Sequence, residues 1–213
     1  MESKVRLIIF DLDGTLVDAY PAIISSFNHT LRRMGYPSQD SLIIRRAVGW
    51  GDENLLKPFL KRKDLKVALA IYRRHHQKAL LRCSRLFPQA KAVLRDLKRK
   101  GYRLAVASNR PSRFSRILIR HLGLERYFTY VLCADRVKYG KPHPEILKKI
   151  MGRLRLAPPE AIYVGDMTID AQAGRRAKIK TIIVTTGSSS QAEIKREKPW
   201  RAIGRIGDLL KMF

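Results

Sequence analysis

The sequence is poor in cysteine and has no long apolar segment. Only Cys83 and Cys133 occur among 213 residues, fifty positions apart, so neither a paired-cysteine metal motif nor a disulfide framework fits them. We expect two structural thiols and a reducing compartment, the cytoplasm. The apolar stretch at residues 7–10 is too short for a signal-peptide core, and no run approaches the roughly 18 residues of a membrane span. We therefore expect a soluble protein with no membrane partner.

Acidic residues are also scarce, because 18 aspartates and glutamates stand against 44 lysines and arginines, for a formal net charge of +26. Such a surplus attracts nucleic acids and small anions alike. Residues 18–84 carry 13 basic and 5 acidic side chains and the rest of the chain carries 31 and 13, so the surplus is spread out. We interpret it as a general surface bias with at most weak, non-specific nucleic-acid binding. A dedicated nucleic-acid groove remains the alternative.

Five short apolar runs are typical of buried strands in a parallel sheet: residues 5–10, 103–107, 130–133, 161–164 and 181–185. Between the later runs, apolar residues recur at helical spacing within 90–97, 114–122 and 146–154. This alternation predicts an α/β fold with a doubly wound, mainly parallel sheet. The serine-rich patch at 187–190 is expected to be a loop after the last core strand.

The segment between the first two strands is too long for a simple crossover. It contains no convincing strand and has amphipathic helical patterns at 22–34, 41–48, 54–60 and 65–81. We expect residues 18–84 to form a helical cap domain, and residues 1–17 and 85–213 to form the core. A cap inserted here would cover the carboxyl end of the first strand, where ligands bind in open α/β sheets.

The first apolar run ends in the sequence FDLDGTLVD at residues 10–18. Side chains two apart on a strand share a face, so Asp11 and Asp13 can point at one ligand. Two carboxylates this close repel each other unless they share a cation or a proton. The plainer interpretation is a turn or helix-cap cluster, which would be favoured for an isolated Asp-x-Asp.

Three further motifs follow predicted strands in order: VASNR at 106–110, GKPHPE at 140–145 and VGDMTID at 164–170. Together with DLDGTLVD they resemble the haloacid-dehalogenase-type hydrolases, especially their phosphoglycolate-phosphatase-like branch. The resemblance covers essentially the whole chain, including the placement of the cap. It implies a Rossmann-like core and a phosphatase.

The resemblance also implies a reaction. Asp11 would attack phosphorus as a covalent nucleophile, and Asp13 would act as general acid and then general base. The implied cofactor is Mg²⁺, with Asp11, Asp166 and the backbone carbonyl of Asp13 as ligands and Asp170 in the outer coordination shell.

The remaining motif residues would bind the substrate. Ser108 and Asn109 would donate hydrogen bonds to phosphoryl oxygens, and Lys141 would stabilise charge on nucleophile and phosphate. The segment AVGWGDENLL at 47–56 resembles the one that phosphoglycolate phosphatases use near the substrate, so Trp50 and Asn54 become candidate substrate-binding residues.

Three positions depart from that pattern. Trp50 is bulky, Gln89 stands where a glycine usually follows the proline, and Met167 replaces a small residue. We therefore expect a small phosphorylated metabolite, of a class no narrower than phosphomonoesters, with inorganic pyrophosphate or a nucleotide as alternatives. The protein itself is expected to be a monomer or homodimer.

Several residues have plainer interpretations. Ser108 could cap a helix, Lys141 could be one more solvated base, and Asp170 could complement a helix dipole. His143 is expected to be a capping residue. His75 and His76 are expected to be surface histidines, and Trp50 and Trp200 are expected to be packing residues.

Two functional alternatives stay open. A phosphosugar mutase shares the core motifs and differs mainly in its cap. A nucleic-acid-binding protein, or a phosphatase acting on nucleic-acid ends, would use the same fold and the surplus of positive charge. Asp13 argues against a true dehalogenase, because that branch lacks the second aspartate.

Overall fold

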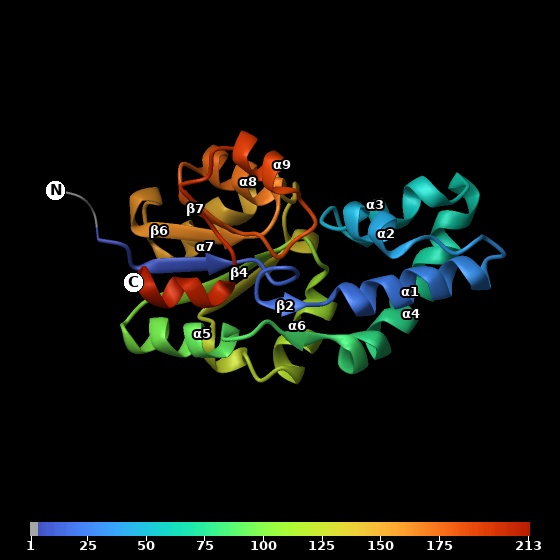
Figure 1. Ribbon diagram of the computed structural model, residues 1–213, viewed down its shortest axis with the longest axis horizontal. Helices are drawn as coiled ribbons and strands as arrows, with labels where there is room; N and C mark the ends of the chain where they lie inside the picture. The colour runs from blue at the N-terminus through green and yellow to red at the C-terminus, as the bar shows by residue number, and fades with distance from the viewer. Residues whose placement is uncertain (1–3) are drawn as a thin grey trace.

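The computed structural model describes residues 4–213. Its centre is a six-stranded sheet in the order β5-β4-β1-β6-β7-β8, and every neighbouring pair is parallel (Figure 1). The strands are β1 (Leu7–Phe10), β4 (Arg103–Ser108), β5 (Tyr130–Cys133), β6 (Ala161–Gly165), β7 (Lys180–Val184) and β8 (Arg201–Ile203). Because β4 and β5 lie on one side of β1 and the later strands β6, β7 and β8 lie on the other, the strand order reverses at β1, and ligands bind at the carboxyl end of such a switch point.

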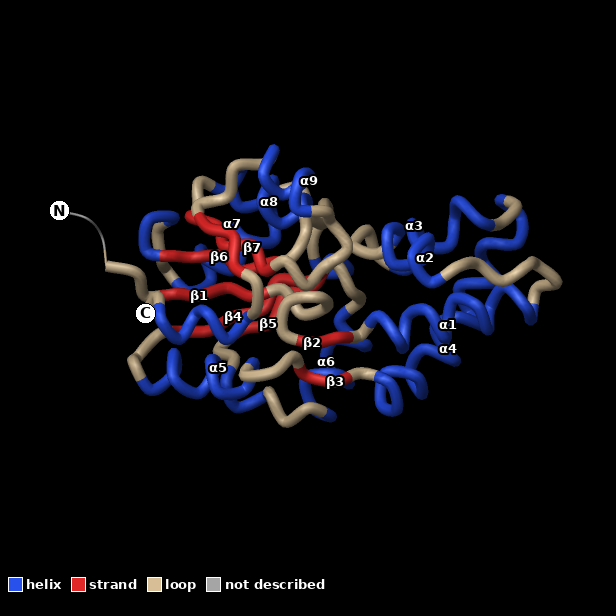
Figure 2. Tube along the Cα trace, in the orientation of Figure 1, coloured by secondary structure: helices blue, strands red, loops and turns tan. Residues whose placement is uncertain are grey.

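Helices cover both faces of this sheet (Figure 2). One face carries α7 (Glu145–Leu154) and α8 (Thr168–Ala177), with α9 (Gln191–Arg196) beside them. The other face carries α5 (Ala90–Arg99), α6 (Ser112–His121) and the C-terminal 3-10 helix η6 (Ile206–Lys211). Three single-turn 3-10 helices occupy the connections: η3 (Glu125–Tyr127), η4 (Ala134–Arg136) and η5 (Pro158–Glu160). The doubly wound architecture predicted from the sequence is confirmed.

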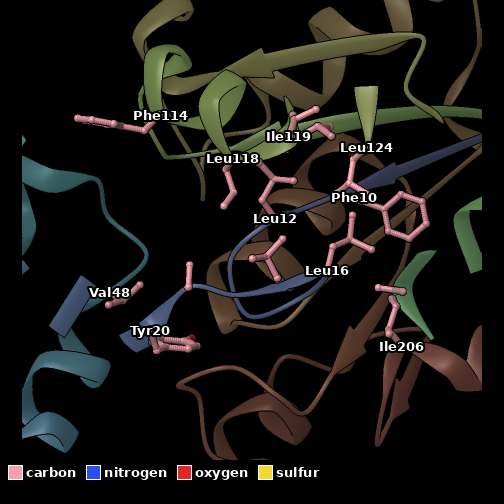
Figure 3. Close-up of a cluster of buried hydrophobic side chains, with 14 of the residues drawn as sticks. Phe10, Leu12, Leu16, Tyr20, Val48, Phe114, Leu118, Ile119, Leu124 and Ile206 are labelled. Atoms are coloured by element: carbon pink, nitrogen blue, oxygen red, sulfur yellow. The ribbon is translucent and has the colours of Figure 1, made fainter. Parts of the chain in front are cut away.

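Strand β1 shows how the sequence builds both layers. Ile8 and Phe10 are fully buried in the cluster that includes α5 and α6, while Leu7 and Ile9 are fully buried against α7 and α8. Successive side chains on a strand point to opposite faces, so a strand covered on both sides is continuously apolar. Each such side chain contributes about 1.5–3 kcal/mol by leaving water. Phe10 lies between the α6 side and Ile206 of η6 (Figure 3).

Four helices form the inserted segment: α1 (Tyr20–Arg33), α2 (Ser41–Ala47), α3 (Asp52–Leu56) and α4 (Leu65–Cys83). Helix α1 lies along α4, away from the chain termini (Figure 1). The side chain of Asp40 caps α2 by accepting the Leu42 N–H at 2.7 Å. The antiparallel ribbon of β2 (Val17–Asp18) and β3 (Arg85–Leu86) joins this segment to the sheet.

The structure corrects four details of the prediction. Asp18 belongs to β2, so the segment 18–84 is not free of strand. The helix expected at 54–60 is the short α3, followed by the 3-10 helix η1 (Lys57–Phe59), because Pro58 lacks the N–H that an α-helix needs. A second 3-10 helix, η2 (Arg62–Asp64), precedes α4. The loop at 187–190 follows β7, which is not the last strand, since the three-residue edge strand β8 comes later.

Both cysteines are free; Cys83 is half-buried and Cys133 is buried, as expected of structural thiols. Within residues 4–213, none of the helices combines the length and apolar character needed to cross a bilayer.

Candidate active site

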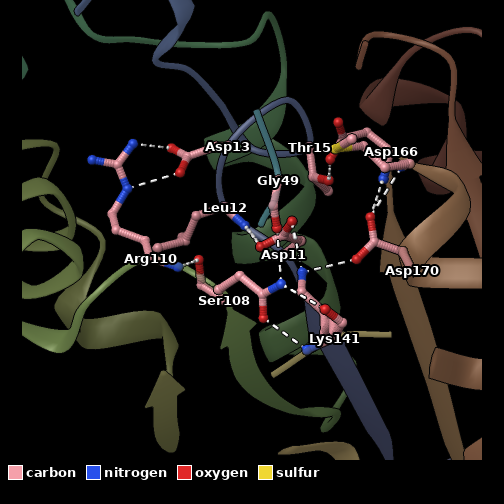
Figure 4. A network of polar contacts seen from close by, with 12 residues as sticks. Asp11, Leu12, Asp13, Thr15, Gly49, Ser108, Arg110, Lys141, Asp166 and Asp170 are labelled. Atoms are coloured by element: carbon pink, nitrogen blue, oxygen red, sulfur yellow. Dashed lines mark hydrogen bonds and ion pairs between the residues drawn. The ribbon is translucent and has the colours of Figure 1, made fainter. Parts of the chain in front are cut away.

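The carboxyl ends of β1, β4 and β6 meet at one edge of the sheet, and the predicted motif residues converge there (Figure 4). Asp11 directly follows β1, Ser108 ends β4 and Asp166 directly follows β6. Lys141 lies in the loop before α7, and Asp170 lies in the first turn of α8. All five are buried, although each is polar or charged. Burial of such groups is unfavourable unless each finds a partner.

Lys141 finds three partners, one for each of its N–H groups. Its Nζ lies 2.8 Å from Asp11 Oδ2, 2.8 Å from Asp170 Oδ1 and 2.9 Å from the hydroxyl of Tyr163. Burial alone would lower the pKa of Lys141, but the two carboxylates outweigh it and raise that pKa. Lys141 is therefore a charged, fixed group, and its interpretation as a solvated base is wrong.

Both oxygens of Asp170 are occupied by donors. Oδ1 accepts the Lys141 ammonium and the Tyr163 hydroxyl, the latter at 2.6 Å. Oδ2 accepts the backbone N–H groups of Asp166 and Met167 at 3.1 and 3.0 Å. Asp170 thus caps the first turn of α8 and also holds Lys141. Tyr163 was missed by sequence reasoning, because it reads as one more apolar strand residue in β6.

Three carboxylates at this edge form a group that could hold a divalent metal ion. Oxygen atoms of Asp11, Asp166 and Asp170 all lie within 4.8 Å of one another. Asp166 Oδ1 accepts the Thr15 hydroxyl at 2.7 Å, whereas its buried Oδ2 has no hydrogen-bond partner among residues 4–213. A buried carboxylate oxygen without a donor is costly unless a cation lies beside it. Hard oxygen ligands of this kind suit Mg²⁺.

Glycine backbone keeps the space beside that oxygen open. A Cβ at Gly14 would lie 2.2 Å from Asp166 Oδ2, and a Cβ at Gly187 would lie 2.1 Å from it. Gly14 also has φ of +83°, in the left-handed region that favours glycine. Any side chain at either position would fill the approach to the carboxylate.

The electrostatics of the group point the same way. Burial raises the pKa of Asp11 to about 7, against the opposing charge of Lys141 and with the help of the Asp170 charge. Burial, then the charges of Asp170 and Asp11, also raise the pKa of Asp166 well above its ordinary value. One lysine does not balance three buried carboxylates, so a divalent cation would relieve their repulsion.

Asn109 lines the same pocket, but its side-chain amide is used by protein backbone. Oδ1 accepts the Lys141 N–H at 2.8 Å, and Nδ2 donates to the carbonyls of Lys141 and Gly49 at 2.9 and 2.8 Å. The side chain predicted to contact substrate therefore fixes the Lys141 loop and ties it to the inserted helices.

Asp13 lies on the opposite side of Asp11 and is paired with a residue that sequence reasoning missed (Figure 4). Arg110 Nε donates to Asp13 Oδ2 at 2.8 Å, and Arg110 Nη2 lies 2.7 Å from Asp13 Oδ1. Only the first of these contacts has hydrogen-bond geometry; Asp13 Oδ1 has no hydrogen-bond partner among residues 4–213, and its contact with Nη2 is a close ion pair. Arg110 immediately follows the predicted Ser108-Asn109 pair, so its position in that motif could have identified it as a site residue.

His76 completes this contact from α4. Its Nε2 lies 2.8 Å from Arg110 Nη1, and the residue is only 3% exposed. Because arginine only donates, Nε2 must be the acceptor, so His76 is neutral and carries its proton on Nδ1. Burial, and then the charge of Arg110, lower the pKa of His76 to about 2. The expectation that His76 lies at the surface is wrong.

Comparison with known proteins identifies this arrangement. The family model of the haloacid dehalogenase-like hydrolases matches residues 8–184. The chain belongs to the haloacid dehalogenase-like hydrolase family. A phosphoglycolate phosphatase of Aquifex aeolicus is 30% identical over 209 residues, covering 98% of this chain and 97% of that protein. A plasmid-encoded phosphoglycolate phosphatase of Cupriavidus necator is 32% identical over 186 residues, covering 84% and 80%.

A solved structure agrees with these relatives. The crystal structure of a predicted phosphoglycolate phosphatase from Haemophilus somnus has a TM-score of 0.94 and 27% identity, covering 100% of this chain and 99% of that one. Together the matches group this haloacid dehalogenase-like chain with phosphatases, in the phosphoglycolate-phosphatase-like branch that its motifs predicted.

The residues that the inserted segment contributes to the pocket differ from those predicted. A cavity of about 60 Å³ opens beside Asp11 and Asp13. The inserted segment contributes to its lining Ile23, Val48, Gly49, Gly51, Asp52, Leu55, Tyr72 and His76. Trp50 and Asn54 do not line it: Trp50 is 47% exposed, and Asn54 Nδ2 donates to the Trp50 carbonyl at 3.0 Å. The lining of the cavity gives no support to their predicted contact with substrate, which stays a prediction.

The plainer interpretations mostly fail. Ser108 does not cap α6, which begins four residues later with Pro111 as its N-cap. Instead its Oγ accepts the Arg110 N–H at 3.2 Å and faces the pocket. Trp200, expected to pack, is 40% exposed. His143 does resemble a capping residue, since its Nδ1 accepts the Glu145 N–H at 3.3 Å.

Proposed function

We propose that this chain is a magnesium-dependent phosphatase that hydrolyses a small, phosphoglycolate-like phosphomonoester through an aspartyl-phosphate on Asp11. The observation that carries the proposal is the position of Asp11 between two different environments. On one side its carboxylate contacts Lys141 and lies with Asp166 and Asp170; on the other lies Asp13, two residues along.

The metal side fits Mg²⁺ because its donor set is entirely oxygen and includes the unpartnered Asp166 Oδ2. Asp11, Asp166 and the backbone carbonyl of Asp13 would hold the ion, and Asp170 would stay in the outer shell, since both of its oxygens are engaged. When bound, the ion would offset the charges of nucleophile and phosphate.

The chain's own residues would then carry out two displacements. Asp11 attacks phosphorus and forms a P–O bond, the bond from phosphorus to the leaving oxygen breaks, and Asp13 gives that oxygen a proton. Water then attacks the phosphorus of the aspartyl-phosphate and gives its proton to Asp13, which restores Asp11 and releases phosphate. Ser108 and Lys141 hydrogen-bond to the phosphoryl oxygens throughout.

We also propose the predicted division into a core (1–17 and 85–213) and a cap (18–84), with substrate size limited by the cap. The lining that α1–α4 contribute is mostly apolar and leaves a small cavity, which suits a leaving group of a few heavy atoms. The two relatives compared in sequence above are both phosphoglycolate phosphatases. They therefore do not favour the phosphosugar-mutase or the nucleic-acid alternative.

The test is hydrolysis of p-nitrophenyl phosphate by the purified chain with Mg²⁺, with excess chelator, and by Asp11→Asn. We expect turnover only with the divalent ion and a loss of roughly 10⁴–10⁶-fold in Asp11→Asn, because the amide keeps the shape and removes the nucleophile. Asp208→Asn, the same substitution in the C-terminal 3-10 helix, is the matched control and should retain full activity. Undiminished activity in chelator, or in Asp11→Asn with deamidation excluded, would refute the proposal.

A further inference from the structure

A groove outside the candidate active site lies at the edge of the sheet. It follows the edge strand β8 beside α9, has a volume of about 690 Å³, and shares no lining residue with the cavity beside Asp11. Its apolar lining includes Ile194, Pro199 and Ile203. The chain turns sharply between α9 and β8, where Lys198 has φ of +49°, in the left-handed region. This groove takes no part in the proposed reaction.

Trp200 lines the groove, and its indole ring lies among cations. Lys180 Nζ is 5.2 Å and Arg201 Cζ is 5.4 Å from the centre of the ring. The residue is exposed, so burial in the core does not account for its position. Aromatic rings with cations beside them are what proteins use to bind single-stranded nucleic acids, because a base stacks on the ring while the cations contact phosphates.

The positive charge around this ring is not neutralised. The bases at the groove are Lys180, Lys195, Lys198 and Arg201. Residues 171–213 carry ten basic and only three acidic side chains. Each acid is paired with an arginine that does not line the groove: Glu193 with Arg46, Glu197 with Arg175 and Asp208 with Arg205. Within the part of the chain that the structure describes, the four bases at the groove therefore have no acidic partner.

The chemistry of the groove favours one occupant over two related ones. A duplex presents only base edges in its grooves, so an indole ring cannot stack on its bases. A free mononucleotide makes one stack and two or three exposed ion pairs, which corresponds to a dissociation constant of roughly 1 mM. A single strand repeats these contacts and releases counterions at each neutralised phosphate, so it gains most from a basic surface.

We propose that the groove between α9 and β8 binds single-stranded nucleic acid, with a base stacked on Trp200 and adjacent phosphates on Lys195, Lys198 and Arg201. The cations beside the ring have long, exposed side chains, which can move from the ring to a phosphate. The strand is bound and not hydrolysed. This inference does not depend on the proposed phosphatase function, since the two sites share no residue.

The net charge of +26 makes some nucleic-acid binding inevitable, so the test must separate the groove from the rest of the surface. Binding through general charge is the same for a strand and a duplex of equal phosphate number and does not need an aromatic ring. Binding in the groove prefers the strand and depends on Trp200. The deciding quantities are therefore the preference for strand over duplex and the effect of removing one ring.

The experiment measures fluorescence anisotropy of a labelled oligothymidylate of about 12 nucleotides, within the site size of one stacking module, and of a duplex with the same number of phosphates. Both carry hydroxyl groups at their ends, so that no terminal phosphate enters the active site. The proteins are wild type, Trp200→Ala, Trp200→Phe and Lys198→Gln. Trp50→Ala and Lys63→Gln are the matched controls, because both residues are exposed on the inserted helices.

We expect wild type to bind the strand about tenfold more tightly than the duplex, as one base stack provides. Trp200→Ala should lose this preference, Trp200→Phe should keep most of it, and Trp50→Ala should equal wild type. Lys198→Gln should make the slope of log K against log salt shallower by about 0.7, the value for one phosphate of a single strand. Lys63→Gln should leave that slope unchanged.

Equal affinity of wild type for strand and duplex, or an unchanged preference in Trp200→Ala, would overturn the inference in favour of general surface charge. Displacement of the strand by micromolar thymidine monophosphate would also overturn it, in favour of a small-molecule site. Hydrolysis of p-nitrophenyl phosphate tests the phosphatase proposal separately and does not bear on either result.

A second measurement decides if Trp200→Ala does not fold, as judged by its circular dichroism. The chain has two tryptophans, so Trp50→Phe leaves Trp200 as the only one. A base stacked on this ring quenches its emission. Saturable quenching by the strand and not by the duplex supports the inference, and unchanged emission at saturating strand refutes it.

Discussion

On the side of the pocket next to β6 and α8, Lys141 takes all its partners from the core, whereas on the other side Arg110 of the core meets His76 of helix α4. The first side is complete within one rigid sheet edge. On the second side, the pair of Arg110 with Asp13 also lies within the core, and only the contact of Arg110 with His76 depends on the inserted helices. The two sides therefore differ in how much the inserted helices contribute to them, and each can be changed by substitutions that leave the other in place.

The inserted helices are held on the core by a shared buried cluster, in which Tyr72 of α4 lies with Phe114 of α6, and by polar contacts that are partly exposed. Among the polar contacts, Arg46 Nη1 donates to the Ser188 carbonyl at 2.6 Å, and Arg46 also pairs with Glu193 at 2.6 Å. Exposed ion pairs of this type contribute about 0–1 kcal/mol each, so they add little to the apolar packing.

The largest expected effect comes from breaking the core side at Lys141. Lys141→Met should lower kcat roughly 10²–10³-fold, because it removes the fixed charge that faces Asp11 and the phosphoryl group. Phosphoglycolate and p-nitrophenyl phosphate should lose activity by the same factor, because the lost charge acts on the phosphoryl group that both esters share. Steady-state kinetics on the two esters measures this, and a loss confined to one ester would contradict that role of Lys141.

Tyr163→Phe is the graded companion on the same side. It removes one acceptor from Lys141 and one donor from Asp170 but leaves both charges in place. A buried polar group left without its partner costs about 1–3 kcal/mol, so we expect a smaller loss of kcat, about tenfold, with KM unchanged.

The sequence predicts the Lys141 side of the pocket better than the Arg110 side. Asp11, Ser108 and Asp166 end neighbouring parallel strands, so their convergence follows from strand order alone. His76 could not be predicted, because only the packing of α4 against α6 turns one of two adjacent helical histidines inward. Trp50 shows a second limit: its neighbours Gly49 and Gly51 line the cavity as the segment's resemblance led us to expect, whereas the Trp50 side chain is largely exposed.

The fold shows the same limit. Runs of apolar residues predicted five strands, including the edge strand β5, with shifts of at most two residues at their ends. The edge strand β8 has only three residues, two of them exposed, and offers no such run. The apolar pattern of a segment therefore predicts a strand whose own residues are apolar, and it misses a strand that forms only because a neighbouring strand offers hydrogen bonds.

The next prediction sharpens the comparison through pH and concerns His76. Its pKa is about 2 in the folded chain and near 6.5 in an unfolded one, so between these values the unfolded state binds the extra proton. Stability from this group is therefore complete above pH 6.5 and declines by roughly 1.4 kcal/mol per unit as the pH falls. His76→Gln keeps an acceptor for Arg110 and should remove this slope. Urea unfolding of both proteins from pH 4.5 to 7 measures the difference.

Two features make that comparison specific. Asp11, with its raised pKa, contributes a slope of opposite sign in metal-free protein, but it is present in wild type and variant and cancels in their difference. His121→Gln, in the exposed last turn of α6, is the control and should keep the wild-type slope. Equal slopes in wild type and His76→Gln would mean that His76 is protonated in the folded chain.

The smallest expected effect lies outside both sides of the pocket, where the chain returns from β3 to α5. Gln89 has φ of +64°, in the left-handed region that favours glycine. A non-glycine residue there costs about 1–2 kcal/mol, partly offset because glycine loses more conformational freedom on folding. Gln89→Gly should therefore raise the free energy of unfolding by about 0.5–1 kcal/mol, and Tm by roughly 1–4 °C, with kcat and KM unchanged.

Gln89→Ala separates backbone strain from side-chain contact, because it removes the side chain that lies against Gly207 but keeps the Cβ. It should give no gain, and a more stable Gln89→Ala than Gln89→Gly would show that the side chain, and not the backbone angle, is the source of strain.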